Sequence, residues 1–90
     1  FKVAKKMYAL VGLEWNPLGI NLKCDPDDAH ILRSQFDAII PGYHMNKDHW
    51  NTVILDGSLD ADLVKKLIED SYVLVVNSMS KKEQKRLGVI

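Results

Sequence analysis

The sequence predicts an α+β fold: a two-layer domain with an antiparallel sheet of about five strands and helices packed on one face. Short apolar runs rich in alternating or β-branched residues precede position 56, and two segments carry apolar residues at helical spacing. Helix-start signals stand at Asp25 and Ser58. The 90 residues, of which 47% are hydrophobic, are expected to make one domain over 1–90.

Two extended runs at the start of the chain predict a β-hairpin. Residues 1–4 and 7–13 are mainly apolar and are separated by Lys5-Lys6, so the two lysines are expected at the hairpin tip. Both alternating faces of the second run are apolar, which favours a central strand. Asn16-Pro17-Leu18-Gly19 then predicts a turn, and residues 20–24 alternate as a half-buried strand does.

A helix is expected to begin after Asp25. Asp25 can cap it, Pro26 fits the first helical position, and the acidic residues that follow complement the helix dipole. Ala29, Leu32 and Phe36 place an apolar stripe on one face. The helix is expected to end near Phe36.

Residues 39–43 and 50–55 predict a second hairpin, with residues 45–49 at its tip. Pro41 cannot donate a ladder hydrogen bond, so the first of these strands is expected at an edge of the sheet or with an irregular start. The second is rich in β-branched and aromatic residues, as strands are.

A long helix is expected over Leu59–Met79, with Ser58 as its N-cap. Propensity alone would favour a strand over the β-branched run 72–76. An apolar stripe at helical spacing continues through that run, and no Gly or Pro interrupts it, so we predict helix. Ser80-Lys81-Lys82-Glu83 is a capping box, which predicts a short final helix ending before Gly88.

Charge and cysteine content limit the functional classes. The chain has 12 Lys and Arg against 12 Asp and Glu, which argues against a strongly basic nucleic-acid binder but leaves room for a local basic face. Cys24 is the single cysteine, so no internal disulfide can form and a reducing cytoplasm is the expected compartment. No apolar run approaches the roughly 20 residues of a membrane span, and no signal peptide is visible.

The densest cluster of polar and aromatic side chains lies between Tyr43 and Ser58. It consists of three blocks: Tyr43-His44-Met45-Asn46-Lys47, His49-Trp50-Asn51-Thr52-Val53 and Leu55-Asp56-Gly57-Ser58. These blocks resemble the signature of the MmcQ/YjbR family, which has the form YHMNK-HWNTV-LDGS. The resemblance covers nearly the whole chain and implies a bacterial protein with a two-layer fold similar to that of CyaY and frataxin.

The resemblance also implies a function, because the family is described as DNA-binding with a double-wing shape. Two hairpin tips would then contact double-stranded DNA, with basic side chains on phosphates, amides on base edges or backbone, and an aromatic ring that stacks or wedges. The residues expected at this contact are Lys5, Lys6, Asn46, Lys47, His49, Trp50 and Asn51.

Family members usually carry a helix before the first strand, whereas this sequence starts at Phe1 within an expected strand. An N-terminal part is therefore expected to be missing. An absent helix would leave one sheet face partly bare, and a bare apolar face favours a homodimer.

The signature stretch also allows other roles. Asn46 can hold a turn, Trp50 can pair with Tyr43 across strands, and Asn51 can bond a loop carbonyl. As an alternative function, the surface from Tyr43 to Asn51 would contact a protein or a small ligand with little dependence on salt. The densest positive patch lies elsewhere and could meet phosphate or simply be solvated; it comprises Lys81, Lys82, Lys85 and Arg86.

No metal, cofactor or catalytic group is expected. His44, Asp48 and His49 supply too few converging ligands, and the acidic residues near position 25 already have a role at a helix start. Cys24 follows the inward phase of its strand, which favours a buried, inert thiol over a nucleophile. Without a nucleophile–base pair, a phosphate loop or metal spacing, we do not expect an enzyme.

Overall fold

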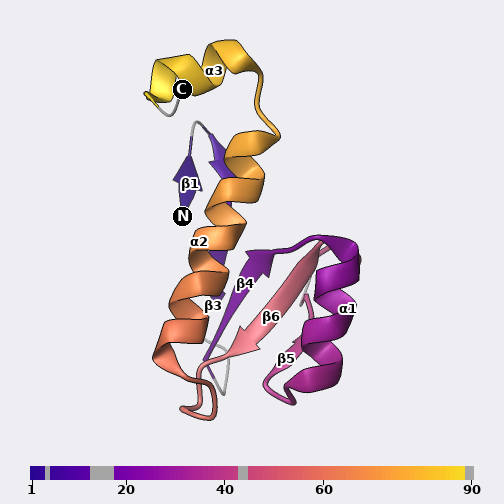
Figure 1. Ribbon diagram of the computed structural model, residues 1–90. Helices are drawn as coiled ribbons and strands as arrows, with labels where there is room; N and C mark the ends of the chain where they lie inside the picture. The colour runs from indigo at the N-terminus through magenta and orange to yellow at the C-terminus, as the bar shows by residue number, and fades with distance from the viewer. Residues whose placement is uncertain (4, 13–17, 43–44, 89–90) are drawn as a thin grey trace.

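Six strands and three helices form the described part of the chain, which a computed structural model defines over residues 1–3, 5–12, 18–42 and 45–88 (Figure 1). The strands are β1 (Lys2–Val3), β2 (Lys6–Met7), β3 (Ala9–Gly12), β4 (Gly19–Lys23), β5 (Ile39–Pro41) and β6 (Trp50–Ile54). The helices are α1 (Pro26–Gln35), α2 (Ala61–Asn77) and α3 (Lys81–Leu87). The predicted α+β class is confirmed.

The strands form two antiparallel sheets instead of one sheet of about five strands. β1 pairs with β2, and the other four strands have the order β3-β4-β6-β5. The predicted central strand over 7–13 is wrong: it divides at Tyr8, and β3 lies at a sheet edge. The edge position predicted for the strand with Pro41 is confirmed, as is its hairpin with β6. The predicted turn at residues 16–19 lies mostly outside the described residues.

Ser71 of α2 fixes the break at Tyr8. Its hydroxyl donates to the Tyr8 carbonyl at 2.6 Å and accepts the backbone N–H of Lys23 at 2.8 Å. A helix side chain therefore satisfies backbone groups that a neighbouring strand would otherwise satisfy. The Tyr8 ring stands edge-to-face against Tyr72, with 5.2 Å between ring centroids. From this point the β1–β2 hairpin lies beside α2 (Figure 1).

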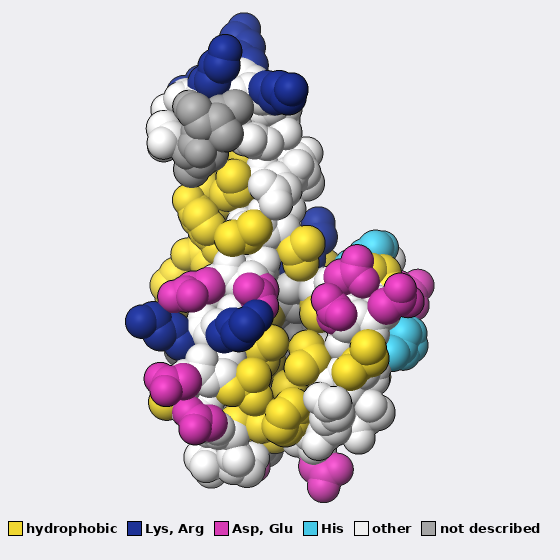
Figure 2. Space-filling view, viewed as in Figure 1, with side chains coloured by type: hydrophobic (Ala, Val, Ile, Leu, Met, Phe, Trp, Pro, Cys, Tyr) yellow, Lys and Arg dark blue, Asp and Glu magenta, His cyan; other side chains and the backbone are white. Residues whose placement is uncertain are grey.

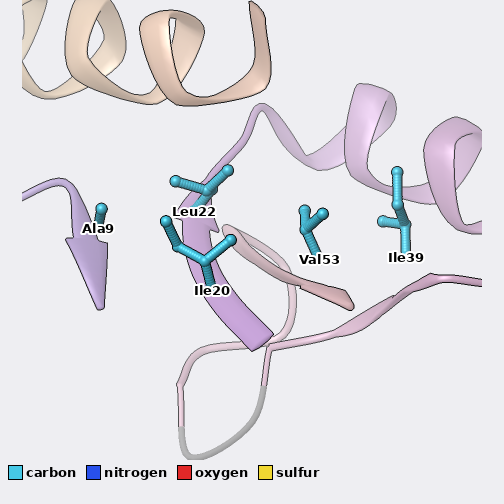
Figure 3. Packing of buried hydrophobic residues seen from close by; sticks show 5 residues of the cluster. All are labelled: Ala9, Ile20, Leu22, Ile39 and Val53. Atoms are coloured by element: carbon cyan, nitrogen blue, oxygen red, sulfur yellow. The ribbon is translucent and has the colours of Figure 1, made fainter. Parts of the chain in front are cut away.

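The core lies between the four-stranded sheet and helices α1 and α2. Figure 3 shows the buried strand side chains pointing toward the helices; they are Ala9, Ile20, Leu22, Ile39 and Val53. Partly buried residues of the two helices and of the α1 C-cap pack on them, namely Leu32, Phe36, Val64, Leu67 and Ile68. Full burial of one large aliphatic side chain stabilises a fold by about 1.5–3 kcal/mol, so this layer holds the domain together.

The opposite face of the sheet carries a polar pair at its centre. Asn21 and Thr52 are neighbours on β4 and β6, are 0% and 2% exposed, and are joined by a hydrogen bond from the Thr52 hydroxyl to Asn21 Oδ1. Leu10 and Ile40 flank this pair on the edge strands and are 37% and 39% exposed. Neither α1 nor α2 lies on this face. A homodimer through a bare sheet face stays a prediction.

The caps predicted for α1 and α3 are confirmed, and the cap predicted for α2 is wrong. Asp25 and Ser80 each accept a backbone N–H from the first turn of their helix. In α2 this role belongs to Asp60. The N–H of Ser58 instead donates to the Asp56 side chain at 2.9 Å, which forms a turn just before the helix.

The β-branched run 72–76 is helical, as predicted. Val75 and Val76 are 2% and 6% exposed, so packing of the apolar stripe outweighs the strand propensity of these residues. Gly88 ends α3 with a φ of 79°, a left-handed conformation that suits glycine.

Candidate functional site

The stretch between Tyr43 and Asn51 is predicted to be one contact surface, but its described residues face different ways. Tyr43 and His44 lie outside the described residues. Asn46, Lys47 and His49 are exposed in the loop between β5 and β6, and Trp50 is half-buried at the start of β6. Asn51 is buried on the helix side of the sheet, because successive strand residues point to opposite faces.

Hydrogen bonds within the protein hold this loop. Asn46 Oδ1 accepts the N–H of Asp48 at 2.9 Å, so Asn46 has the turn-forming role that the sequence allows for it. Arg33 of α1 donates from Nη2 to the Lys47 carbonyl at 2.8 Å. The Lys47 ammonium donates to the Gly42 carbonyl at 3.4 Å. Acidic side chains gather over neighbouring α1 (Figure 2), so the surface around the loop has mixed charge.

Gly42 allows β5 and β6 to approach closely beside Trp50. The N–H of Gly42 donates to the Trp50 carbonyl at 2.9 Å. A Cβ atom at position 42 would lie 2.8 Å from the Trp50 Cβ, which is closer than real Cβ atoms come. Trp50 therefore takes part in the packing of the hairpin. A DNA contact by this ring stays a prediction.

The described residues give little support to a metal site or to a reactive thiol. No group of three or more His, Cys, Asp or Glu among them could hold a metal ion. Cys24 is half-buried, and burial, followed by the charges of Asp28 and Asp25, raises its pKa above the usual thiol value. This shift disfavours the thiolate, which is the reactive form of a cysteine. Within the described ranges, no helix is both long enough and apolar enough to cross a membrane.

The first predicted hairpin is present as β1 and β2, but only one of its two lysines lies in the turn. Lys5 occupies the turn with a φ of 68°, in the left-handed region that non-glycine residues seldom adopt. Lys6 lies in β2 opposite Val3 and not at the tip, which corrects the prediction. Both side chains are exposed.

Helix α3 lies at the same end of the molecule as this hairpin. Gln84 Nε2 donates to the carbonyls of Val76 and Met79, at 3.2 and 3.1 Å, which ties α3 to the C-terminal end of α2. Met79 is 5% exposed. The hairpin begins at the Tyr8–Tyr72 contact and extends along α2 toward that same end (Figure 1).

We call the surface formed by β1, β2 and α3 the basic end. Its cations are Lys2, Lys5, Lys6, Lys81, Lys82, Lys85 and Arg86, and its acidic residue is Glu83. All seven cationic side chains are exposed. Lys and Arg gather over α3 in Figure 2, whereas Asp and Glu lie on α1 and the lower part of α2. The balanced total of 12 cations and 12 acidic residues therefore conceals a polarised distribution.

The cations of the basic end have no carboxylate partner among the described residues. The ion pair within the described part of the chain joins Lys66 to Asp70 at 2.7 Å, one turn apart on α2 and away from the basic end. Among the described residues, no ion pair therefore neutralises a cation of the basic end, where Glu83 is outnumbered by seven cations.

A groove of about 500 Å³ lies between α1 and α2 above the sheet. Figure 2 shows apolar side chains in the space between the two helices. The apolar lining consists of Leu22, Ile31, Leu32, Ile39, Val53, Leu63, Leu67, Val73 and Leu74. The polar lining consists of Lys23, Cys24, Asp25, Asp28, Asn51, Lys66 and Asp70. We call this feature the α1–α2 groove.

Asn51, which lines this groove, carries a buried polar atom without a partner among the described residues. Its Nδ2 donates to the Ala29 carbonyl at 3.5 Å. Its Oδ1 is buried and has no hydrogen-bond partner among the described residues. Such atoms are rare. Strand alternation from half-buried Trp50 could have signalled the inward orientation of Asn51, but only the packing of the helices reveals the groove.

The YjbR family model matches residues 1–74. The chain belongs to the YjbR family. The signature blocks between Tyr43 and Ser58 lie inside this match, so the resemblance seen in the sequence is confirmed. Three uncharacterized bacterial proteins illustrate the relationship.

YbdF of Escherichia coli O157:H7 is 38% identical over 87 residues, which are 97% of this chain and 71% of YbdF. YjbR of Escherichia coli K12 is 37% identical over 86 residues, or 96% of this chain and 73% of YjbR. YyaQ of Bacillus subtilis strain 168 is 40% identical over 55 residues, or 61% of this chain and 46% of YyaQ.

Solved YjbR-like structures share the fold. The crystal structure of Deinococcus radiodurans protein DR2400, with family-model domain DUF419, has a TM-score of 0.87 at 45% identity and covers 92% of this chain. A Pseudomonas syringae protein has a TM-score of 0.70 at 40% identity and covers 79% of this chain. This chain spans 62% of the Deinococcus protein and 68% of the Pseudomonas protein.

The basic end combines a part of the chain inside the YjbR match with a part outside it. The hairpin with Lys5 and Lys6 lies inside the match, which ends at residue 74 within α2. Helix α3 and its four cations lie beyond it.

Proposed function

We propose that this YjbR-family chain binds double-stranded DNA through its basic end, by contact with the phosphate backbone. The observation that carries the proposal is the concentration of seven exposed cations and one acidic residue on the β1–β2 hairpin and α3. Neutralisation of phosphates by Lys and Arg, with release of counterions, supplies most of the affinity of non-specific DNA binding. The proposal is one of binding and assigns no catalytic group.

The shape of the basic end supports this role. The hairpin turn presents Lys5, and α3 presents a second row of cations anchored by Gln84. These two elements take the place of the two hairpin wings implied by the family resemblance. The proposed contact does not require the loop that carries Asn46, Lys47 and His49, because the surface around this loop has mixed charge. Asn51 is buried and is left out of the proposed contact.

A salt titration with matched variants tests the proposal. Fluorescence anisotropy with a labelled mixed-sequence duplex should show affinity that falls steeply with salt, by a log–log slope of about −0.9 per neutralised phosphate. The double variant Lys81→Gln/Lys85→Gln should bind at least about tenfold more weakly at low salt, with a slope smaller by about 1.8. Absence of binding by the unmodified chain at low salt would overturn the proposal.

The matched control is Lys65→Gln/Lys66→Gln, which removes the same charge from an exposed surface of α2 outside the basic end. It should bind nearly as the unmodified chain does. Equal losses in the two double variants would mean that only net charge matters, and the basic end would not be the site. Lys47→Gln then decides the extent of the contact: a slope smaller by about 0.9 adds the loop to it.

A further inference from the structure

The chain has a β-bulge where the β1–β2 hairpin joins the four-stranded sheet. The N–H groups of Tyr8 and Ala9 both donate to the Phe1 carbonyl, at 3.1 and 3.4 Å. The Phe1 nitrogen donates in turn to the Ala9 carbonyl at 2.8 Å. Two residues of one strand therefore face a single residue of the other, which is the pattern of a bulge. A bulge bends its strand and increases the local twist, so this one sets the direction in which the hairpin leaves the sheet.

Ser71 of α2 holds the bulge in place. Its side chain is 0% exposed, donates to the Tyr8 carbonyl at 2.6 Å and accepts the Lys23 N–H at 2.8 Å. One hydroxyl therefore connects the bulged residue, the end of central strand β4 and helix α2. Because a buried polar group without partners is costly, these two hydrogen bonds favour the observed position of the bulge over others.

Aromatic packing supports the same junction. The ring of Tyr72, the next residue of α2, lies 5.2 Å from the Tyr8 ring, and the Phe1 ring lies 6.4 Å from the Tyr8 ring on the hairpin side. Aromatic pairs of this kind add to the stability that burial provides. Ser71 and Tyr72 thus hold the hairpin to α2 through the backbone and the side chain of one residue, Tyr8.

The other cations of the basic end are attached to α2 at a different point. Gln84 ties α3 to the carbonyls of Val76 and Met79. Val76 follows Ser71 on the same helix at a rise of about 7.5 Å, at 1.5 Å per residue. Because a continuous helix connects the two attachment points, the fold sets the spacing between the cations of the hairpin and those of α3.

A fixed spacing of cations favours a ligand of fixed shape. Double-stranded DNA presents its phosphates in two rows on either side of a groove, about 6 Å wide in the minor groove and about 12 Å wide in the major groove. A stiff duplex makes full contact only with cations that are already held in a matching arrangement. A flexible single strand can follow cations in many arrangements. The position of the hairpin therefore matters for the duplex and little for the single strand.

We propose that Ser71 is a positioning residue that makes the basic end prefer double-stranded over single-stranded DNA. Its hydrogen bond to the bulge holds the hairpin with Lys5 and Lys6 at a fixed place relative to α3, so that both sets of cations contact one duplex. Ser71 itself is buried and touches no DNA. This role rests on the proposed DNA binding and adds to it the class of nucleic acid and the residue that selects it.

The experiment measures the affinities of the unmodified chain and of Ser71→Ala for a labelled mixed-sequence duplex and for one of its strands, by fluorescence anisotropy at low salt. The unmodified chain should bind the duplex at least about fivefold more tightly. Ser71→Ala keeps every cation, so its affinity for the single strand should change by less than about twofold while its affinity for the duplex falls about fivefold or more.

Two results would contradict the positioning role and are distinct from failure of DNA binding itself. A folded Ser71→Ala variant with an unchanged ratio of duplex to single-strand affinity would overturn it. Equal affinities of the unmodified chain for the two ligands would also overturn it while leaving DNA binding intact. Absence of binding to both ligands would overturn the proposed function together with this role.

Residual dipolar couplings measured by NMR test the position of the hairpin without DNA. In Ser71→Ala the couplings of the β1–β2 hairpin should average to smaller values relative to those of α2, because the hairpin has lost its hydrogen bond to the helix. Couplings within β4 and β6 should stay as they are in the unmodified chain. Unchanged couplings in the hairpin would overturn the positioning role.

Ile39→Val is the control for lost stability. It trims a side chain that is 2% exposed on β5, in the sheet and away from the hairpin, and should leave the affinity ratio unchanged. Equal falls of the ratio in Ile39→Val and Ser71→Ala would assign the effect to stability and overturn the positioning role. If Ser71→Ala does not fold, Tyr72→Leu replaces it, because it removes the ring contact with Tyr8 and keeps an apolar side chain on α2. An unchanged affinity ratio in Tyr72→Leu would then overturn the role.

Discussion

The two halves of α2 support two regions of different character. Its N-terminal half packs Val64, Leu67 and Ile68 against the four-stranded sheet, whose core side chains are 1–6% exposed. Its C-terminal half holds the basic end, through the Tyr72 ring and the hydrogen bonds of Gln84. The first region contains the apolar core cluster and most of the acidic residues, and the second contains most of the cations. Stability and the proposed DNA contact therefore depend on different residues and can be altered separately.

The largest expected difference between the regions is in global stability. Leu22→Ala removes a side chain that is 3% exposed in central strand β4, and it should lower the free energy of unfolding by about 2–5 kcal/mol. Leu87→Ala on α3, where the side chain is 37% exposed, should cost less than about 1 kcal/mol. Urea denaturation of both variants measures this. Equal losses would show that the basic end is part of the same core.

Removal of the α3 cap should have a smaller and local effect. Ser80 Oγ accepts the N–H of Glu83 at 3.2 Å, so Ser80→Ala should destabilise α3 by about 0.5–2 kcal/mol. Amide exchange should accelerate in α3 and stay unchanged in β4 and β6. Ser58→Ala is the control, because Ser58 does not cap α2, and it should change stability by less than about 0.5 kcal/mol. Faster exchange throughout the sheet after Ser80→Ala would contradict the separation of the two regions.

The smallest expected effect concerns the thiol of Cys24, which lies in the region that contains most of the acidic residues. Burial raises the pKa of Cys24 first, and the negative charge of Asp28 raises it further. Since the thiolate is the form that reacts, Asp28→Asn should lower this pKa and move the pH dependence of alkylation by iodoacetamide modestly to lower pH. Asp62→Asn, an exposed acid in the first turn of α2, serves as control. A shift toward higher pH in the Asp28 variant would contradict the assigned cause.

Local signals predicted most of the elements. The helix starts at Asp25 and Ser80 are visible because cap, first-turn acid and apolar spacing agree within a few residues. The sequence determines the N-cap of α2 less clearly, since Ser58 and Asp60, two positions apart, are both of residue types that cap helices. The break at Tyr8 depends on Ser71, 63 residues further along the chain, and no local pattern can show that contact.

The candidate sites were predictable only as separate fragments. The lysines at positions 5 and 6 and the basic cluster after position 80 are plain in the sequence, but their meeting at one end of α2 follows from the Tyr8–Tyr72 contact and the Gln84 hydrogen bonds. The sequence predicts Asn51 as a residue of the DNA contact at the start of the strand 50–55. Its inward orientation follows from strand alternation, but its unpaired Oδ1 depends on the positions of both helices.

The polar pair at the centre of the sheet also determines which alignment of β4 with β6 is tolerated. A slip by one residue would turn Asn21 into the apolar layer beneath the helices and move Ile20 and Leu22 to the other face. A slip by two residues in one direction would set Asn21 opposite Ile54, which has no hydroxyl to replace that of Thr52. Loss of a buried hydrogen-bond partner costs about 1–3 kcal/mol. Asn21 and Thr52 thus favour the observed register of β4 with β6, because misaligned pairings of these strands would lose their hydrogen bond as the sheet folds.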